Sequence, residues 1–292
     1  MHKLLSLAAL SGALAIWPAG AATYIHVVPV AGAVKTQATA INDKNAITGV
    51  YFDNAQVAHG FVGTLAGDYQ TFDFDGGTNS APFGIDRVGD TVGAGFTTQP
   101  DCSAKPFERM TSGKIKPIKK DGKKVGGAAL GMNTPGDFVG FVCEGSSPAA
   151  GYRGRNAQWT APVTLSGAHI LTMPMGINAF GTIVGWTMDT DTKIRGFVLK
   201  DGVTSAVAYP GATQTQLAGV NDDGVATGTQ TTNGIAHAFL YDVNSAQFTS
   251  IEPPGATTSI AGGIDSGGLA AVASDMGSFI YCPKKKTNCS SL

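Results

Sequence analysis

Charged residues are scarce in this sequence. Its 292 residues include 20 Lys and Arg and 21 Asp and Glu, which leaves a formal net charge of −1. A balance this even argues against a nucleic-acid partner, which demands a dominant basic footprint. Long helical patterns are missing as well, while glycine is abundant at 40 residues. Together these features favour an all-β protein with many tight turns.

The common signatures of catalysis are also missing. The sequence has no G-x-S-x-G nucleophile elbow, no Asp-box turn of the sialidase kind and no paired C-x-x-C that would hold zinc. The segment Asp265-Ser266-Gly267-Gly268 resembles the nucleophile region of trypsin-like proteases. It fills a turn that recurs through the chain, however, and turn chemistry explains it fully. We therefore predict no catalytic residue and no metal ligand.

The N-terminus has the form of a secretory signal peptide. Lys3 supplies a positive charge, an apolar stretch runs from Leu4 to Trp17, and Ala19-Gly20-Ala21 forms a small-x-small cleavage site. The apolar stretch is short for a membrane span, which needs roughly 20 residues. We expect cleavage of residues 1–21 and a mature chain of 22–292 in an oxidising compartment, either the periplasm or the extracellular space. An uncleaved anchor is the alternative.

One phrase, a small residue followed by an apolar residue and then Asn or Asp, recurs six times. Successive apolar members, here called anchors, are 44, 47, 45, 43 and 44 residues apart. A short apolar stretch ending in Gly follows five anchors, and an aromatic residue follows each anchor after about 15 to 27 residues. The anchors are Ile41, Ile85, Met132, Ile177, Val220 and Ile264, and the aromatics are Phe61, Phe107, Trp159, Phe197, Phe239 and Phe279. Such a period indicates a repeat architecture.

Each unit accommodates four short strands, called A to D in chain order. In the first unit the pattern predicts strands at about 37–42, 46–52, 59–64 and 69–74. Asn, Asp and Gly between strands A and B suit a tight hairpin turn. Six units of four antiparallel strands predict a single six-bladed β-propeller over residues 22–292.

The two ends of the chain predict how the ring closes. The last unit offers strands at 259–265, 269–274 and 278–282 but no strand D. The mature N-terminus begins with an unassigned strand at 24–28, in the register that strand D occupies elsewhere. We expect this strand to complete the sixth blade, so that neither end is left to fray.

Several phrases recur among the units. They include Gly181-Thr182-Ile183-Val184-Gly185, His237-Ala238-Phe239-Leu240-Tyr241 and Pro254-Gly255-Ala256-Thr257, with the variants His59-Gly60-Phe61 and Arg195-Gly196-Phe197. In these phrases the chain resembles the HAF-type extracellular repeats of bacteria, over nearly all of its mature length. The second and third units have lost the motif. The resemblance implies export and a propeller-like repeat, and it implies no activity or functional residue.

Four cysteines remain in the mature chain. Cys102 lies in the B–C loop of the second unit and Cys143 at the end of strand B of the third, so both open on one face of adjacent blades. Cys282 and Cys289 flank the tail that follows the last strand. We favour the pairs Cys102–Cys143 and Cys282–Cys289, while other pairings stay open. By loop entropy they would stabilise the fold by roughly 4 and 2.5 kcal/mol.

Several polar features allow two interpretations each. The residues after the anchors could form an oxygen ring that holds Ca²⁺, although six equivalent Asx turns are the simpler interpretation. These residues are Asn42, Asp86, Asn133, Asn178, Asn221 and Asp265. His59 and His237 share a repeat position and are expected to bond a neighbouring turn. Six lysines between 114 and 124 either discourage edge pairing or contact an anionic envelope.

The B–C and D–A loops should surround one mouth of the propeller channel, and they vary most between units. The longest, at 144–155 in the third unit, contains Tyr152, Arg153 and Arg155, which could stack on and hydrogen-bond a sugar or peptide. The fourth unit adds Asp189 and Asp191. These five residues are the predicted binding residues. An ordinary exposed loop is the alternative.

We predict a secreted, non-catalytic binding module that acts as a monomer. Its partner would be an extracellular or envelope component, a glycan or a protein, and it would require no cofactor and no membrane span after signal cleavage. One alternative is a secreted polysaccharide hydrolase or lyase, which needs converging carboxylates at the channel mouth. The other is an architectural cell-surface protein.

Overall fold

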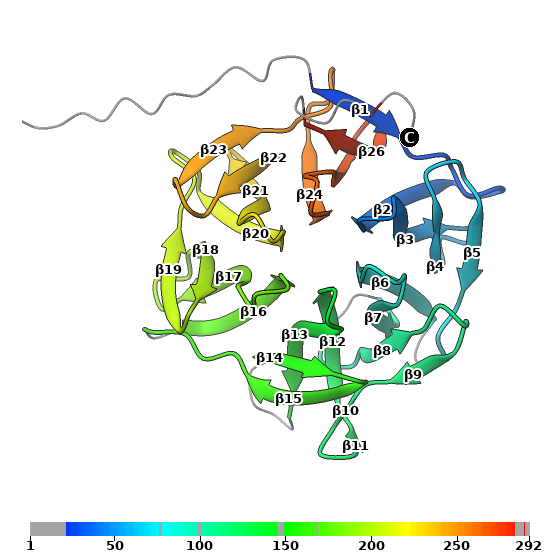
Figure 1. Ribbon diagram of the computed structural model, residues 1–292, viewed down its shortest axis with the longest axis horizontal. Helices are drawn as coiled ribbons and strands as arrows, with labels where there is room; N and C mark the ends of the chain where they lie inside the picture. Colours follow the sequence, from blue (N-terminus) through cyan, green and yellow to red (C-terminus); the bar gives the residue numbers. More distant parts are fainter. Residues whose placement is uncertain are drawn as a thin grey trace, which may run out of the picture.

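Six β-sheets are arranged around a central axis (Figure 1). This computed structural model describes residues 22–75, 78–98, 101–144, 149–167, 169–283 and 289, so the expected signal peptide at 1–21 lies outside the described residues. The prediction of an all-β, six-bladed propeller is confirmed. Over the described ranges, no helix is long and apolar enough to cross a membrane.

Four of the sheets are simple four-stranded antiparallel blades, with strand A next to the axis and strand D outermost. Blade 1 contains β2 (Lys35–Ile41), β3 (Ala46–Phe52), β4 (Ala58–Thr64) and β5 (Tyr69–Phe72). Blade 2 contains β6 (Asn79–Ile85), β7 (Thr91–Phe96), β8 (Lys105–Arg109) and β9 (Ile115–Pro117). Blade 4 contains β16 (His169–Ile177), β17 (Ile183–Asp189), β18 (Ile194–Lys200) and β19 (Val203–Val207). Blade 5 contains β20 (Gln214–Val220), β21 (Val225–Thr232), β22 (Ile235–Asp242) and β23 (Gln247–Ser250).

Blade 6 is built from both ends of the chain, as the sequence predicts. Its strands are β24 (Ser259–Ile264), β25 (Ala270–Ser274), β26 (Gly277–Cys282) and, outermost, β1 (Thr23–His26). The pairing of β1 with β26 is antiparallel and places Tyr24 opposite Tyr281. The ring is therefore closed by hydrogen bonds between the first and last strands, which leaves β26 with no open edge.

Blade 3 differs from the predicted four strands. Its core is β12 (Gly126–Met132), β13 (Asp137–Cys143), β14 (Ala150–Arg155) and β15 (Gln158–Pro162). A hairpin of β10 (Lys119–Lys120) and β11 (Lys123–Lys124) adds two outer strands, and β10 pairs with β15 in parallel. The lysine-rich segment after β9 is thus a hairpin that extends blade 3 beyond the ring (Figure 1).

In five of the six blades, close packing requires the glycine in strand B. A Cβ atom on Gly49 would lie 2.0 Å from the Gln37 carbonyl oxygen and 2.8 Å from the Phe61 ring. Gly49 is opposite Phe61 in the register, and four other blades pair a strand-B glycine with an aromatic residue in the same way. A side chain at this glycine would have to displace either strand A or the aromatic ring.

In blade 3 the residue opposite the strand-B glycine corrects a sequence prediction. Gly140 lies opposite Tyr152, not Trp159. Trp159 is on β15, in strand D, where its ring contacts Phe138 at 5.0 Å between centroids. Blade 3 therefore uses Tyr152 as its strand-C aromatic, and the identification of Trp159 with that position was wrong.

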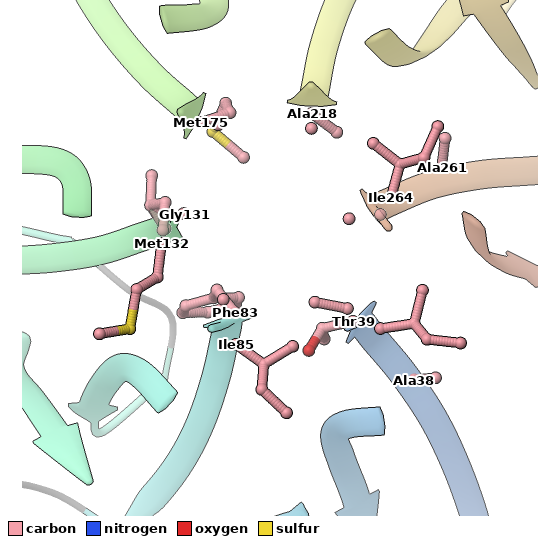
Figure 2. Close-up of a pocket in the computed structure, with 18 of the residues that line it drawn as sticks. Ala38, Thr39, Phe83, Ile85, Gly131, Met132, Met175, Ala218, Ala261 and Ile264 are labelled. Atoms are coloured by element: carbon pink, nitrogen blue, oxygen red, sulfur yellow. The ribbon is translucent and has the colours of Figure 1, made fainter. Parts of the chain in front are cut away.

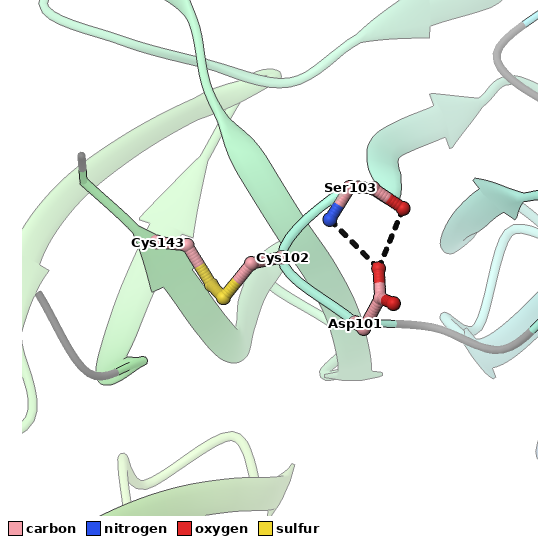
Figure 3. Close-up of a disulfide and its surroundings, with 4 residues drawn as sticks. All are labelled: Asp101, Cys102, Ser103 and Cys143. Carbon is pink, nitrogen blue, oxygen red and sulfur yellow. Dashed lines mark hydrogen bonds between the residues drawn. A yellow bond between two sulfur atoms is a disulfide. The ribbon is translucent and has the colours of Figure 1, made fainter. Parts of the chain in front are cut away.

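Two disulfides join the cysteines, one between Cys102 and Cys143 and one between Cys282 and Cys289. The first ties the B–C loop of blade 2 to the end of β13 in blade 3 (Figure 3). The Cys102 loop crosses so close to Gly126 that a Cβ there would lie 2.0 Å from the Cys102 carbonyl oxygen. Two disulfides suggest an oxidising, extracytoplasmic compartment.

Candidate functional site

A chamber of about 330 Å³ occupies the centre of the ring (Figure 2). It is lined mainly by the A strands of all six blades. The lining also includes Val50 and Ala273, from the B strands of blades 1 and 6. It extends to Gln37 and Ile260 near the starts of their strands, and thus reaches the face of the D–A loops.

A β-bulge in every A strand decides which side chains line the chamber. Each bulge lies just before the anchor phrase, as between Ala38 and Ala40 in β2, and it leaves an extra residue out of the ladder. Bulges re-aim side chains, and here they turn them toward the axis. The residues at this position are Thr39, Phe83, Leu130, Met175, Ala218 and, in the longer bulge of blade 6, Gly262.

The bulge side chains make the chamber asymmetric. Phe83, Leu130 and Met175, on blades 2 to 4, are large, whereas Thr39, Ala218 and Gly262 on the other three blades are small. Each of these six residues lines the chamber, and Figure 2 shows Phe83 across the space from Ala218, with Met175 on the strand next to that of Ala218. Every blade thus has a bulge at the same place in its A strand, whereas the side chain that the bulge presents to the chamber differs in each blade.

Among the residues that the structure describes, none that lines the chamber is charged. Its polar side chains are Gln37 and Thr39. Thr39 Oγ1 donates to the Pro82 carbonyl at 2.8 Å, so its hydroxyl is occupied. For the Gln37 carboxamide, the described part of the chain offers no hydrogen-bond partner, and a ligand could provide one. Ile260, at the mouth, is 57% exposed and extends the apolar lining outward.

At the other end of the channel, the six Asx residues are buried and surround a smaller space of about 60 Å³, five of them in its lining. Their Oδ1 atoms accept backbone N–H groups of their own turns, as Asn178 Oδ1 does from Thr182 at 2.9 Å. The Asx-turn interpretation is confirmed by these bonds. No group of three or more His, Cys, Asp or Glu residues in the described ranges could hold a metal ion.

Three predicted binding residues are not in a loop. Tyr152, Arg153 and Arg155 are on β14, so the prediction of a B–C loop over 144–155 was wrong. The side chain of Tyr152 packs against Trp159 and supports the blade, with a centroid distance of 6.3 Å. Arg155 lies at the end of β14 away from the B–C loop, where its Nε is 2.5 Å from Asp137 Oδ1. The structure separates these residues from the chamber because β14 is the third strand from the axis.

Asp189 and Asp191 lie at and just after the end of β17, in the expected B–C connection. Asp189 bonds His169 Nδ1 at 2.7 Å and Thr187 Oγ1 at 3.1 Å, and it contacts Arg195. Burial opposes ionisation of Asp189, but these hydrogen bonds outweigh it and lower its pKa. Arg195 also lowers the pKa of Asp191 to about 2. Both carboxylates therefore pair with Arg195 within the protein, and Asp189 lines a hollow of about 160 Å³.

The two repeat-equivalent histidines bond neighbouring turns, as predicted. His59 Nδ1 lies 2.8 Å from Asp73, in the connection that follows strand D. His237 contacts Glu252, in the corresponding connection of blade 5. These two histidine–carboxylate pairs connect strand C to the D–A loop, and they lie outside the chamber lining.

The chamber residues could not be identified from the repeat, because the residue at the bulge position differs in every unit. The bulge position varies among Thr, Phe, Leu, Met, Ala and Gly, and so it gives no periodic hydrophobic signal. The available signal was that variability itself, at a fixed distance of two residues before each anchor, in units that otherwise agree.

Comparison with known proteins supports the fold alone. No protein-family model and no curated protein matches the sequence. TolB from Acinetobacter baumannii is 11% identical with a TM-score of 0.54, over 82% of this chain and 64% of that chain. A structure of prolyl endopeptidases is 12% identical with a TM-score of 0.53, over 84% and 40%. A streptogramin B lyase is 12% identical with a TM-score of 0.48, over 89% and 97%. This chain spans less than two thirds of the first two chains.

Proposed function

We propose that the protein is a secreted, non-catalytic binding module whose ligand is an uncharged, mainly apolar small molecule held in the central chamber. The observation that carries the proposal is the uncharged lining of a chamber built from six variable bulge residues. Its volume of about 330 Å³ is within the range of small-molecule sites. An apolar ligand gains free energy there by leaving water.

The lining favours an adaptable fit. Met132 and Met175 have flexible, polarizable side chains that suit irregular apolar ligands. Gln37 can fix the orientation of a ligand that carries one hydrogen-bonding group. A charged sugar or peptide is a poorer candidate, since the lining has no charge to offset the cost of its desolvation.

The alternative of a polysaccharide hydrolase has less support. That chemistry requires two carboxyl groups on opposite sides of the scissile bond. No Asp or Glu of the described segments lines the chamber, and Asp189 and Asp191 pair with Arg195 away from it. We therefore do not propose it.

The test uses N-phenyl-1-naphthylamine, an uncharged apolar fluorophore, titrated against the mature protein. We expect saturable binding at one site, with thermal stabilisation of roughly 2.7 kcal/mol at 100 times Kd. Ala218→Leu enlarges a small bulge side chain and should weaken binding at least tenfold. Ala55→Leu adds the same atoms at an exposed loop position and should leave binding unchanged. Equal binding by both variants would place the ligand elsewhere. Failure of apolar probes to bind would favour the architectural alternative.

A further inference from the structure

The outer edge of blade 3 carries an unusual concentration of positive charge. Residues 114–124 contain six lysines and one aspartate, a formal charge of +5, so the rest of a chain with net charge −1 carries −6. The hairpin β10–β11 places Lys119 opposite Lys124 and Lys120 opposite Lys123. Like charges directly opposite each other in a sheet are destabilising. The two facing lysine pairs therefore destabilise the hairpin unless an anionic group lies close to them.

The strand register aligns the hairpin with two of the predicted binding residues. Arg155 on β14 is opposite Gln158 on β15, Gln158 is opposite Lys119 on β10, and Lys119 is opposite Lys124 on β11. Residues directly opposite one another in a sheet point to the same face. Arg155, Gln158, Lys119 and Lys124 therefore form one line of side chains across four strands, here called the basic row.

The basic row continues along β14. Arg153 is two residues before Arg155 and so points to the same face. Asp137 Oδ1 is 2.5 Å from Arg155 Nε, and Asp137 Oδ2 is 3.8 Å from Arg153. One carboxylate shared by two guanidinium groups leaves a net positive charge at this end of the row.

Two acids, Glu144 and Asp121, compensate the charge of Lys120 on the opposite face of the hairpin. Lys120 Nζ lies 2.9 Å from Glu144 and 3.3 Å from Asp121, and 5.6 Å from the centre of the Tyr152 ring. Lys119 and Lys124 form no ion pair within the described ranges. Lys120 thus anchors the hairpin to blade 3, and Lys119 and Lys124 are available to a partner.

We propose that the basic row binds a linear acidic polysaccharide. Neighbouring strands are about 5 Å apart, so the charges follow one another in a line that an extended polyanion can match. The Gln158 carboxamide and the guanidinium groups can also bond the hydroxyls beside each acidic group. A membrane presents its charge over a plane, which one line of side chains matches less well. The site is independent of the central chamber.

The test is calorimetric titration of the mature protein with oligogalacturonate, with a neutral dextran oligomer as the uncharged control. We expect binding at 20 mM NaCl that weakens strongly at 300 mM, because salt screens exposed charges. Lys119→Gln with Lys124→Gln should lower affinity about fivefold or more. Lys44→Gln with Lys200→Gln makes the same charge change on exposed lysines of other blades and should lower it less than twofold.

Four outcomes would overturn the proposal. The first is no binding of oligogalacturonate by the wild-type protein, and the second is an equal loss in both double variants. The third is binding to phosphatidylglycerol vesicles without binding to oligogalacturonate, which would assign the row to a membrane. The fourth is unchanged glycan binding with increased self-association of the Lys119→Gln/Lys124→Gln protein, which would mean that the lysines only prevent edge pairing. Circular dichroism confirms that each variant is folded.

Discussion

The Nδ2 amide of Asn42 donates a hydrogen bond to the main-chain carbonyl of Asp86, 2.8 Å away, across the boundary between blades 1 and 2. Three further boundaries have the same bond, with donors Asn133, Asn178 and Asn221. Each Asx turn therefore organises its own hairpin through Oδ1 and reaches the next blade through Nδ2. Asp86 and Asp265 occupy the other two positions with carboxyl groups.

Asp86→Asn should stabilise the protein at neutral pH. Burial, reinforced by the Asp90 carboxylate, raises the pKa of Asp86 above its ordinary value. The stability that Asp86 contributes is thus complete below about pH 3.9, the pKa of an unfolded Asp, and is lost as pH rises through the raised value. An amide avoids this loss and can donate to the next blade, a gain of about 1 kcal/mol.

Urea denaturation at pH 4 and pH 7 checks this prediction. The difference between Asp86→Asn and wild type should be larger at pH 7. Asn133→Asp is the converse control, since it removes the donor to the Asn178 carbonyl and buries a carboxyl group. It should destabilise the protein at pH 7. Stabilisation by both substitutions would refute the role of the inter-blade bond.

Gly140→Ala should be far more damaging than Gly136→Ala. A Cβ on Gly140 would lie 2.0 Å from the Ala128 carbonyl oxygen, so strand A would have to move. Gly136, in the adjacent A–B turn, has free space around it and a φ of +81°, so its substitution costs about 1–2 kcal/mol of backbone strain. We expect a loss of more than 3 kcal/mol for Gly140→Ala. Thermal denaturation compares the two, and equal losses would show that close packing is not the cause.

The architecture could be predicted from the sequence because the same physical constraint recurs six times. The anchor phrase marks the end of strand A, and the glycine marks where strands A and B nearly touch, so errors in one unit are corrected by the others. The prediction failed in blade 3, where the strand-C aromatic is Tyr152 and lacks the motif. In the sequence pattern Trp159 takes the aromatic position of the third unit, so the segment that forms β14 is predicted as a loop.

His59 should make stability depend on pH near neutrality. Burial alone would lower its pKa, but hydrogen bonds with Asp73 and Asp53 outweigh burial and raise it. The stabilisation is therefore complete below about pH 6.5 and is lost as pH rises through the higher folded value. Wild type should therefore lose stability as pH rises above about 6.5. His59→Gln should remove part of this slope.

His26→Gln is the matched control for His59. His26 is exposed, and it forms no ion pair in the part of the chain that is described. Its variant should retain the wild-type slope when unfolding by urea is followed at several pH values. If the His59→Gln protein keeps the wild-type slope, the hydrogen bonds of His59 with Asp73 and Asp53 do not cause the pH dependence.

The disulfides should contribute unequally. Cys102 and Cys143 are 41 residues apart, whereas Cys282 and Cys289 are 7 apart. Loop entropy predicts losses of about 4 and 2.5 kcal/mol for the corresponding double alanine variants. Urea denaturation measures both losses. A larger effect at the second bridge would show that local contacts of the tail outweigh chain entropy.

The candidate site was less predictable than the fold. The chamber depends on six side chains from distant parts of the sequence, turned inward by bulges whose position is marked in the sequence only by its variability. The basic row likewise depends on register, because Arg155 and Lys119 become neighbours only through Gln158. Local patterns indicate strands, but they do not indicate which residues of different strands share a face.

The pairing of β1 with β26 has a consequence for how the chain is made. Tyr24 is among the first residues of the described chain to be synthesised, and its partner Tyr281 is among the last. Until β26 is present, β1 has no strand in blade 6 with which to pair. Because its only strand partner lies about 250 residues further along the chain, β1 is expected to take its place late in folding, after the more local hairpins of the other blades.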